Sequence, residues 1–209
     1  MYTLYYSPGT ASLAVHLALL ELGVPHELKR VDLGGGEQNT PAYLALNPNA
    51  VVPTLLVDGK PVYEAAALLL LLAERHPEAR LAPAPGSADR GVFLQWMLHF
   101  ANVVQPAFRI WFSPKKYADG EGVMAKDVAR QQIEGAWDRF DAFVAAHGPY
   151  ALGADFGVVD IYATMLMRWS RNMPKPATSW PALAALAARV KSRPTWAKLY
   201  EIEGLTEWA

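Results

Sequence analysis

The chain has 209 residues, a net charge of −1 and a hydrophobic fraction of 52%, which is enough to bury a sizeable core in one large or two small domains. A nearly neutral chain without a basic run gives no electrostatic reason to expect nucleic acid or an anionic membrane as a partner. The absence of cysteine excludes disulfides, thiolate metal sites and a protein thiol nucleophile, so any thiol chemistry must use the thiol of a substrate.

The first part of the chain alternates strand and helix patterns. Gly23 ends the first helix pattern, and Thr40-Pro41 is typical of an N-cap followed by proline at the first helical position. Asp58-Gly59 is typical of a tight hairpin turn. The predicted segments are strands at 4–6, 27–33, 54–57 and 62–63 and helices at 12–22, 40–47 and 64–76. Their order is β-α-β-α-β-β-α.

The rest of the chain has helical patterns only. Pro83, Pro85 and Gly86 indicate a linker. Pro106 lies inside the first helix pattern and is expected to bend it. The predicted helices cover 88–112, 122–147, 158–172, 182–192 and 195–202. We therefore expect a domain at 1–77, a linker at 78–87 and an all-helical domain at 88–209.

The dipeptide Val52-Pro53 stands directly before the third predicted strand. Proline cannot donate a ladder hydrogen bond, so a trans edge-strand proline is one interpretation, and cis bonds make up only about 5% of X-Pro bonds in folded proteins. A cis bond would instead turn the N–H and C=O of Val52 away from the sheet, where an extended peptide could pair with them. The dipeptide alone leaves both interpretations open.

The N-terminus and the histidines give two further expectations. Met1 to Leu4 contains no basic stretch leading into an apolar core, and the longest apolar run, 65–73, is far too short to span a membrane. We therefore expect a cytoplasmic protein. The five histidines, His16 among them, do not have metal-ligand spacing and are each typical of a surface or a satisfied core residue, so no metal site is expected.

Several motifs, in order along nearly the whole chain, resemble those of the cytosolic glutathione transferase superfamily, and most closely its bacterial beta class. They are Tyr5-Tyr6-Ser7-Pro8-Gly9, Asn47 to Pro53, Glu64, and Gly153 with Asp160-Ile161-Tyr162. The resemblance implies an α/β thioredoxin-like N-terminal domain followed by an all-α domain, glutathione as co-substrate, and a homodimer. The function it implies is a detoxifying transferase that conjugates the thiolate of glutathione to a small apolar electrophile.

The resemblance also implies which residues bind glutathione. Val52, presented by a cis Pro53, would pair with the cysteinyl unit, and the helix starting at Glu64-Ala65 would hold the γ-glutamyl carboxylate at its N-terminus. Glu64 would pair with the ammonium group, although by itself it is also a typical acidic residue at a helix start. Gln38 would reach the glycyl end, and an ordinary solvated loop residue is an equal interpretation.

A thiol with a pKa near 8.5 is mostly protonated at neutral pH, so an enzyme that uses it must stabilise the thiolate. A hydroxyl near the N-terminus of the first helix suits this task. The candidates are Thr10, then Ser12, then Tyr6, and Ala11 occupies the position of the beta-class cysteine. Ser12 is equally typical of an N-cap, and Tyr6 of a core residue.

Aromatic residues of the predicted 88–112 helix supply candidates for an electrophile pocket. Phe108, Trp111 and Phe112 lie beyond the Pro106 bend, with Arg109 at the edge. Aromatic residues at helical spacing are, however, more often core.

Several positions depart from the family pattern, and one of them is Gly157, where the family usually has a serine N-cap before Asp160. Alanine stands at Ala11 and at Ala65, where the family has cysteine and serine, and Gln105-Pro106 replaces a histidine and a lysine. A non-catalytic protein that binds glutathione or apolar ligands is therefore an alternative function. A glutathione-dependent isomerase or dehalogenase is another.

Overall fold

The computed structural model describes residues 1–209 and divides into two compact units. One unit contains Met1–Arg80 together with Lys191–Ala209, and the other contains Leu81–Val190. The helix α9 (Pro194–Glu203) therefore belongs with the N-terminal residues, because it packs against the first helix of the chain. The sequence pattern had grouped 88–209 together, since helical periodicity does not reveal which layer a helix joins.

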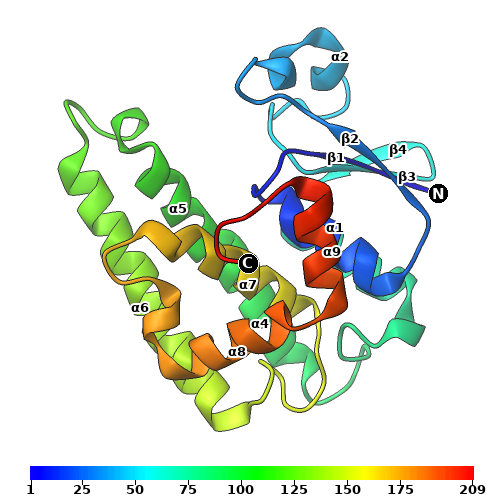
Figure 1. Ribbon diagram of the computed structural model, residues 1–209, viewed down its shortest axis with the longest axis vertical. Coiled ribbons are helices and arrows are strands. Elements are labelled where there is room, and N and C mark those ends of the chain that lie inside the picture. Colours follow the sequence, from blue (N-terminus) through cyan, green and yellow to red (C-terminus); the bar gives the residue numbers. More distant parts are fainter. The chain divides into compact units, whose positions relative to one another are not determined.

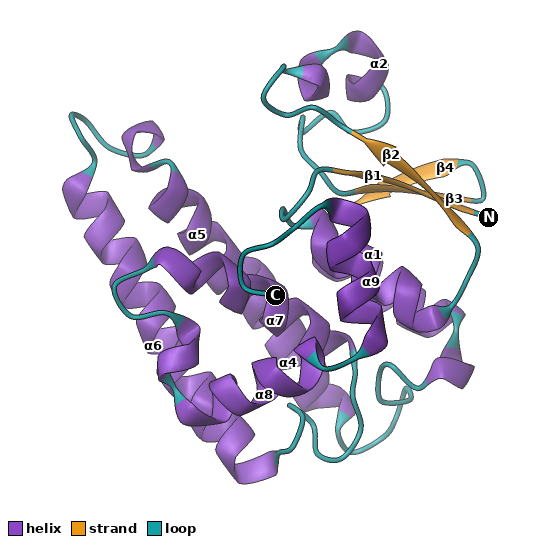
Figure 2. Cartoon of the chain, in the orientation of Figure 1, coloured by secondary structure: helices purple, strands orange, loops and turns teal.

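The first unit is built on a mixed sheet of four strands (Figure 2). The strands are β1 (Tyr2–Tyr6), β2 (His26–Arg30), β3 (Thr54–Val57) and β4 (Lys60–Tyr63), in the order β2-β1-β3-β4. β1 is parallel to β2, and β3 is antiparallel to β1 and β4. The hairpin turn at Asp58-Gly59 has φ angles of 52° and 81°, as expected for a tight turn between antiparallel strands.

Helices cover both faces of this sheet. Figure 1 shows α1 (Ser12–Leu22) and α9 side by side against one face, with α2 (Pro41–Leu44) over the other. α3 (Ala65–Arg75) packs against α1. α1 is buried along its first eight residues, as a helix covered on two sides should be, and Gly23 ends it in the left-handed conformation. These elements confirm the predicted order and the thioredoxin-like fold.

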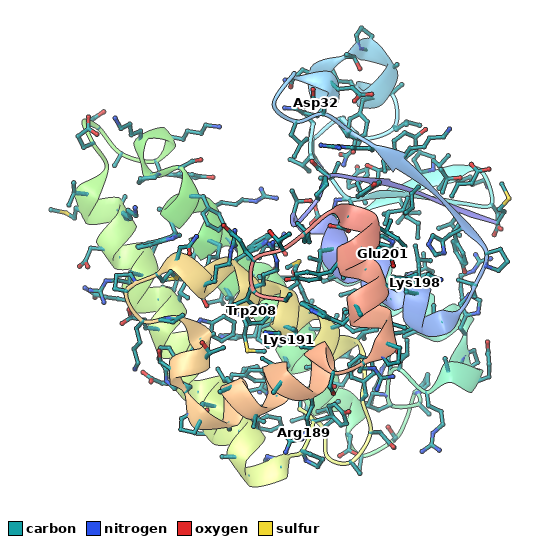
Figure 3. All side chains as sticks on the ribbon, in the orientation of Figure 1. Asp32, Arg189, Lys191, Lys198, Glu201 and Trp208 are labelled. Atoms are coloured by element: carbon teal, nitrogen blue, oxygen red, sulfur yellow. The ribbon has the colours of Figure 1, made fainter.

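The chain after α9 folds back onto its own unit. The Tyr200 hydroxyl donates to the carbonyl oxygens of Glu207 and Trp208, at 3.1 Å each. The Lys191 ammonium lies 4.7 Å from the centre of the Trp208 ring, and both side chains are labelled in Figure 3. Burial lowers the pKa of Lys191.

The second unit is helical. Its helices are α4 (Arg90–His99), α5 (Gln105–Phe112), α6 (Val123–His147), α7 (Val158–Trp169) and α8 (Pro181–Lys191). A π-helical turn, η3 (Phe100–Val104), joins α4 to α5, where a single helix with a bend at Pro106 was expected. Proline cannot donate to the preceding turn and its ring displaces a carbonyl there, and the wider π turn accommodates both effects.

Short 3-10 turns complete the chain, and none of the helices is long and apolar enough to cross a membrane. The turns are η1 (Glu37–Asn39), η2 (Pro77–Ala79), η4 (Pro114–Lys116), η5 (Ser170–Asn172) and η6 (Ala177–Ser179).

The start of α7 explains one departure from the family pattern. Asp160 accepts the N–H groups of Ala151 and Gly157, at 2.8 Å each, which is the acidic half of a capping box. A Cβ atom on Gly157 would lie 2.7 Å from the carbonyl oxygen of Leu81. The serine that usually begins this box does not fit here.

Candidate functional site

The start of α1 carries a compact group of hydroxyls. The Thr10 and Ser12 hydroxyl oxygens lie 2.7 Å and 3.0 Å from the Ser7 carbonyl oxygen and 2.9 Å from each other. The Ser12 hydroxyl also accepts the Ser7 N–H at 3.2 Å. Ser12 is completely buried, whereas Thr10 is half-buried. Of the two hydroxyls, Thr10 is therefore the one that a substrate can reach.

A count of protons defines what these hydroxyls can do. Thr10 and Ser12 bring one proton each, and three close oxygen–oxygen contacts share them. If the Ser12 proton goes to the Ser7 carbonyl, that carbonyl is satisfied. The Thr10 proton can then rotate away to a new acceptor without leaving a buried group unpaired.

A buried pair of side chains, His16 and Glu203, lies beneath this turn. The Glu203 carboxylate of α9 accepts the Gly9 N–H at 2.8 Å with one oxygen and contacts His16 Nδ1 at 2.8 Å with the other. The side chains of His16 and Glu203 are both inaccessible to solvent. α9 thus fixes the backbone next to Thr10. The sequence alone identified His16 only as a satisfied core or surface residue.

Tyr5 and Tyr6, the last two residues of β1, lie on opposite faces of the sheet, as strand alternation requires. Tyr6 is buried and packs its ring 5.8 Å from that of His16, which agrees with its interpretation as a core residue. Tyr5 is half-buried and packs edge-on against Tyr43 at 5.9 Å. Tyr5 therefore faces the cluster that contains Val52, and the sequence analysis passed it over.

The loop before β3 is held by a buried hydrogen-bond network. The Tyr43 hydroxyl and the Asn47 amide each lie 2.8 Å from the Val51 carbonyl oxygen and donate to it. The Thr54 hydroxyl oxygen lies 3.0 Å from the Tyr43 hydroxyl oxygen and accepts from the Asn47 amide nitrogen at 3.2 Å. Burial raises the pKa of Tyr43, so this phenol stays a neutral donor. The network fixes the backbone on both sides of Val52.

The peptide bond between Val52 and Pro53 is cis, as the family resemblance implied. The side chain of Val52 is buried with Val31 and Tyr43. Its main-chain N–H and C=O make no hydrogen bond with the rest of the chain. An extended peptide would find one donor and one acceptor here on a rigid support.

The N-terminus of α3 has no side-chain cap. Glu64 precedes the helix with φ 77° and ψ 110°, its side chain caps nothing, and it is exposed. Such a backbone is sparsely populated for a residue with a side chain and is typical of binding sites. Ala65 and Ala66 follow, so the first N–H groups of the helix meet no side-chain acceptor from their own turn. This is an anion-binding arrangement.

Gln38 turns back onto its own loop. Its amide nitrogen donates to the Leu33 carbonyl oxygen at 3.3 Å, and its amide oxygen is buried without a partner. Leu33 itself packs against the cluster that contains Val52, and the role of Gln38 at the glycyl end stays a prediction.

Two of the three predicted pocket residues form an aromatic group on the second unit. The rings of Phe108 and Phe112 stack with centres 5.8 Å apart, and both meet Trp169 of α7 edge-on, at 5.7 Å and 5.8 Å. Trp111 instead lies against α6, where the Lys126 ammonium is 4.4 Å from its ring centre. We call Phe108, Phe112 and Trp169 the aromatic group.

The first unit offers hydrogen-bonding groups that suit a small peptide. The chain contains no group of three or more histidine, cysteine, aspartate or glutamate side chains placed to hold a metal. Val52 offers an open main chain, Glu64 a carboxylate, and Ala65 a helix N-terminus. These three features match the peptide bond, the ammonium and the carboxylate of a γ-glutamyl peptide.

Comparison with known proteins agrees with this geometry. The model of the glutathione S-transferase N-terminal domain matches residues 10–75. Glutathione S-transferase GstA of Escherichia coli O157:H7 is 29% identical over 208 residues, which cover 97% of this chain and 98% of that protein.

Two solved structures are similar over almost their full lengths. A sphingomonad glutathione S-transferase complexed with glutathione has a TM-score of 0.85 and 32% identity, with 98% of this chain and 100% of that chain covered. The bacterial beta-class enzyme of Sphingomonas chungbukensis has a TM-score of 0.84 and 28% identity, with 98% and 100% covered. The chain belongs to the glutathione S-transferase superfamily.

Proposed function

We propose that this protein is a glutathione transferase that joins the sulfur of glutathione to a small apolar electrophile. The observation that carries the proposal is the unpaired main chain of Val52 beside the open N-terminus of α3. A cytoplasmic homodimer and a role in detoxification are part of the same proposal.

In this proposal the two features of the first unit divide the work of binding. The main chain of Val52 pairs with the cysteinyl unit and so fixes the position of the sulfur. The N–H groups at the start of α3 hold the γ-glutamyl carboxylate, and the Glu64 carboxylate holds the ammonium. Ala65 contributes only its N–H, because it has no hydroxyl.

Thr10 is the proposed donor to the thiolate. Its proton is the one that the Ser7–Thr10–Ser12 group can release. A hydrogen bond to a charged group contributes about 1.5 to 3 kcal/mol, and each pKa unit corresponds to about 1.4 kcal/mol. One such bond thus lowers the pKa of the thiol by roughly one to two units. Ser12 acts as a positioning residue, because it keeps the Ser7 carbonyl satisfied.

The proposal is tested by calorimetric titration with glutathione and by conjugation of 1-chloro-2,4-dinitrobenzene on the same sample. We expect saturable binding and turnover. The absence of binding heat at millimolar glutathione would contradict the proposal. Isomerase and dehalogenase assays on the same sample test the other glutathione-dependent reactions.

Thr10→Val and Thr10→Ser separate the hydroxyl from the shape of the side chain. We expect Thr10→Val to lower kcat/KM about tenfold and to raise the pH midpoint of the rate by about one unit, because it removes one hydrogen bond to the thiolate. Thr10→Ser should keep both values. An unchanged pH profile in Thr10→Val would move the role to another donor, and Tyr5→Phe would then be the next variant.

A second candidate function is binding without catalysis. Ala11, Ala65 and Gln105 stand where related enzymes carry a cysteine, a serine and a histidine, and Gln105 is buried with its amide oxygen accepting from the Tyr162 hydroxyl at 2.5 Å. Saturable glutathione binding without turnover of several electrophiles would favour this function.

A further inference from the structure

The strand ends that carry the proposed glutathione site all meet at one edge of the sheet. In the register of the sheet, Tyr5 of β1 stands opposite Thr54 at the start of β3 on one side and opposite Lys29 of β2 on the other. Thr54 in turn stands opposite Tyr63, the last residue of β4. Along this edge, the strand order β2-β1-β3-β4 (Figure 2) therefore places the end of β2 first, then the end of β1, then Val52, and last the start of α3.

This order gives a direction to a bound glutathione molecule. The proposed function places the γ-glutamyl carboxylate at the start of α3 and the cysteinyl unit at Val52. The glycyl residue must then continue in the same direction, past β1 and toward β2. Adjacent strands lie about 4.8 Å apart and one extended residue spans about 3.5 Å, so the glycyl carboxylate ends near the β1–β2 pair. A carboxylate in this position needs a donor or a cation from β2 or from the loop that follows it.

Lys29 is the cation of β2 that points to the required face. Residues that stand opposite each other in neighbouring strands have their side chains on the same face, so Lys29 shares a face with Tyr5. The Lys29 ammonium lies 5.5 Å from the centre of the Tyr5 ring, and Tyr5 packs against the cluster that contains Val52. Arg30, the other cation of β2, stands opposite Tyr6 and points to the other face.

No carboxylate of the protein neutralises Lys29. Its side chain is exposed and forms no hydrogen bond or ion pair. Glu27, two residues earlier on the same face, has its carboxylate 3.5 Å from the Thr3 hydroxyl oxygen instead. In the loop after β2, the carboxylates of Asp32 and Glu37 accept main-chain N–H groups of that loop. The Lys29 ammonium is therefore available to the carboxylate of a ligand.

We propose that Lys29 binds the glycyl carboxylate of glutathione and so selects the tripeptide over ligands that lack this charge. The inference rests on the proposed function, because it assigns a partner to the third residue of the same ligand. The family resemblance assigned this end of glutathione to Gln38, whose amide is bonded to Leu33. Lys29 lies in none of the family motifs. Its charged hydrogen bond to a carboxylate is stronger than one from a neutral amide.

The test compares two ligands that differ only at the glycyl carboxylate. Glutathione keeps this carboxylate, and its glycyl ethyl ester masks it. In calorimetry, we expect the unsubstituted protein to bind glutathione roughly two- to fivefold more tightly than the ester, which is the size of one exposed charge pair. Lys29→Gln should bind glutathione as weakly as the ester and should keep its affinity for the ester. Lys29→Arg should restore the preference for glutathione.

Arg30→Gln is the matched control. It removes one positive charge from the neighbouring position of β2, where the side chain points to the other face. We expect its preference for glutathione over the ester to equal that of the unsubstituted protein. The proposal is overturned if the two ligands bind equally, if Lys29→Gln weakens both alike, or if Lys29→Gln and Arg30→Gln have the same effect. A preference that survives Lys29→Gln but is lost in Gln38→Ala would overturn it in favour of Gln38.

These outcomes can be told apart from a failure of the proposed function. Glutathione binding and turnover without a preference over the ester would remove the role of Lys29 and leave the transferase standing. A preference that depends on Lys29, without turnover of any electrophile, would do the reverse. The absence of binding heat with either ligand would remove both. The preference for glutathione should also fade between low and high salt.

Discussion

Two helix starts in the first unit use opposite designs. At the start of α1, the Thr10 and Ser12 hydroxyls bond to the main chain of Ser7, and the Glu203 carboxylate accepts the Gly9 N–H. The start of α3 has no side-chain cap, and its preceding residue, Glu64, holds an uncommon backbone conformation. Both ends carry the positive pole of a helix.

The start of α1 suits the positioning of a reactive group, and the start of α3 suits the binding of a ligand. At α1, the polar groups of the protein satisfy one another and leave one rotatable hydroxyl proton. This arrangement suits a hydrogen bond to a reacting group that is held in a fixed position. At α3, the N–H groups stay available and the strain at Glu64 is tolerated, which suits the capture of an anion. Substitutions at α1 should therefore affect folding or turnover, whereas substitutions at α3 should affect glutathione binding.

Glu203→Ala should have the largest effect. It leaves the Gly9 N–H and the buried His16 ring without their acceptor, and each buried donor left unsatisfied costs about 1 to 3 kcal/mol. We expect the free energy of unfolding, measured in urea, to fall by about 2 to 6 kcal/mol. Turnover should fall as well.

Glu201→Ala is the control for this variant. Glu201 lies on the same helix and is exposed (Figure 3), so its loss should change stability by less than about 0.5 kcal/mol. Equal losses in both variants would show that α9 does not act through the buried pair.

Glu64→Gly should separate stability from binding. Glycine adopts the positive φ of 77° without strain, so we expect the free energy of unfolding to rise by about 1 kcal/mol. Loss of the Glu64 carboxylate should lower the affinity for glutathione, measured by calorimetry, about tenfold, because the proposed ion pair with the ammonium is lost. Glu64→Gln should weaken binding without gaining stability. A destabilised Glu64→Gly would mean that the backbone conformation is not strained.

Ala65→Ser should have the smallest effect. It adds a hydroxyl at the first position of α3, and one added hydrogen bond to the γ-glutamyl carboxylate contributes about 0.5 to 1.5 kcal/mol. We expect calorimetry to show glutathione bound up to about tenfold more tightly. Ala67→Ser, on the exposed side of the same helix turn, should leave the affinity unchanged. Equal affinities in the two variants would argue against a ligand carboxylate at the α3 N-terminus.

The fold was largely predictable because its signals are local. Gly23, the Thr40-Pro41 cap and the Asp58-Gly59 turn are where the sequence indicated, since each follows from the conformational limits of one or two residues. The helix ends of the second unit agree to within a few residues. The π turn at 100–104 was missed, because no single residue type specifies it.

The site was predictable only in part. The main chain at Val52 and the position of Glu64 followed from the family motifs. The buried His16–Glu203 pair did not, because 187 residues separate its members and no periodic pattern records such a distance. Strand alternation puts Tyr5 and Tyr6 on opposite faces of β1, but only the packing shows that Tyr5 is on the face of Val52.

The bond between Gly9 and Glu203 also has a consequence for biosynthesis. Its partners are 194 residues apart, so at about 5 to 20 residues per second the ribosome needs about 10 to 40 s to make the second after the first. Until then the turn that carries Thr10 has no buried acceptor beneath it. The hydroxyl proposed to serve the thiol therefore reaches its final setting only after nearly all of the chain has been translated.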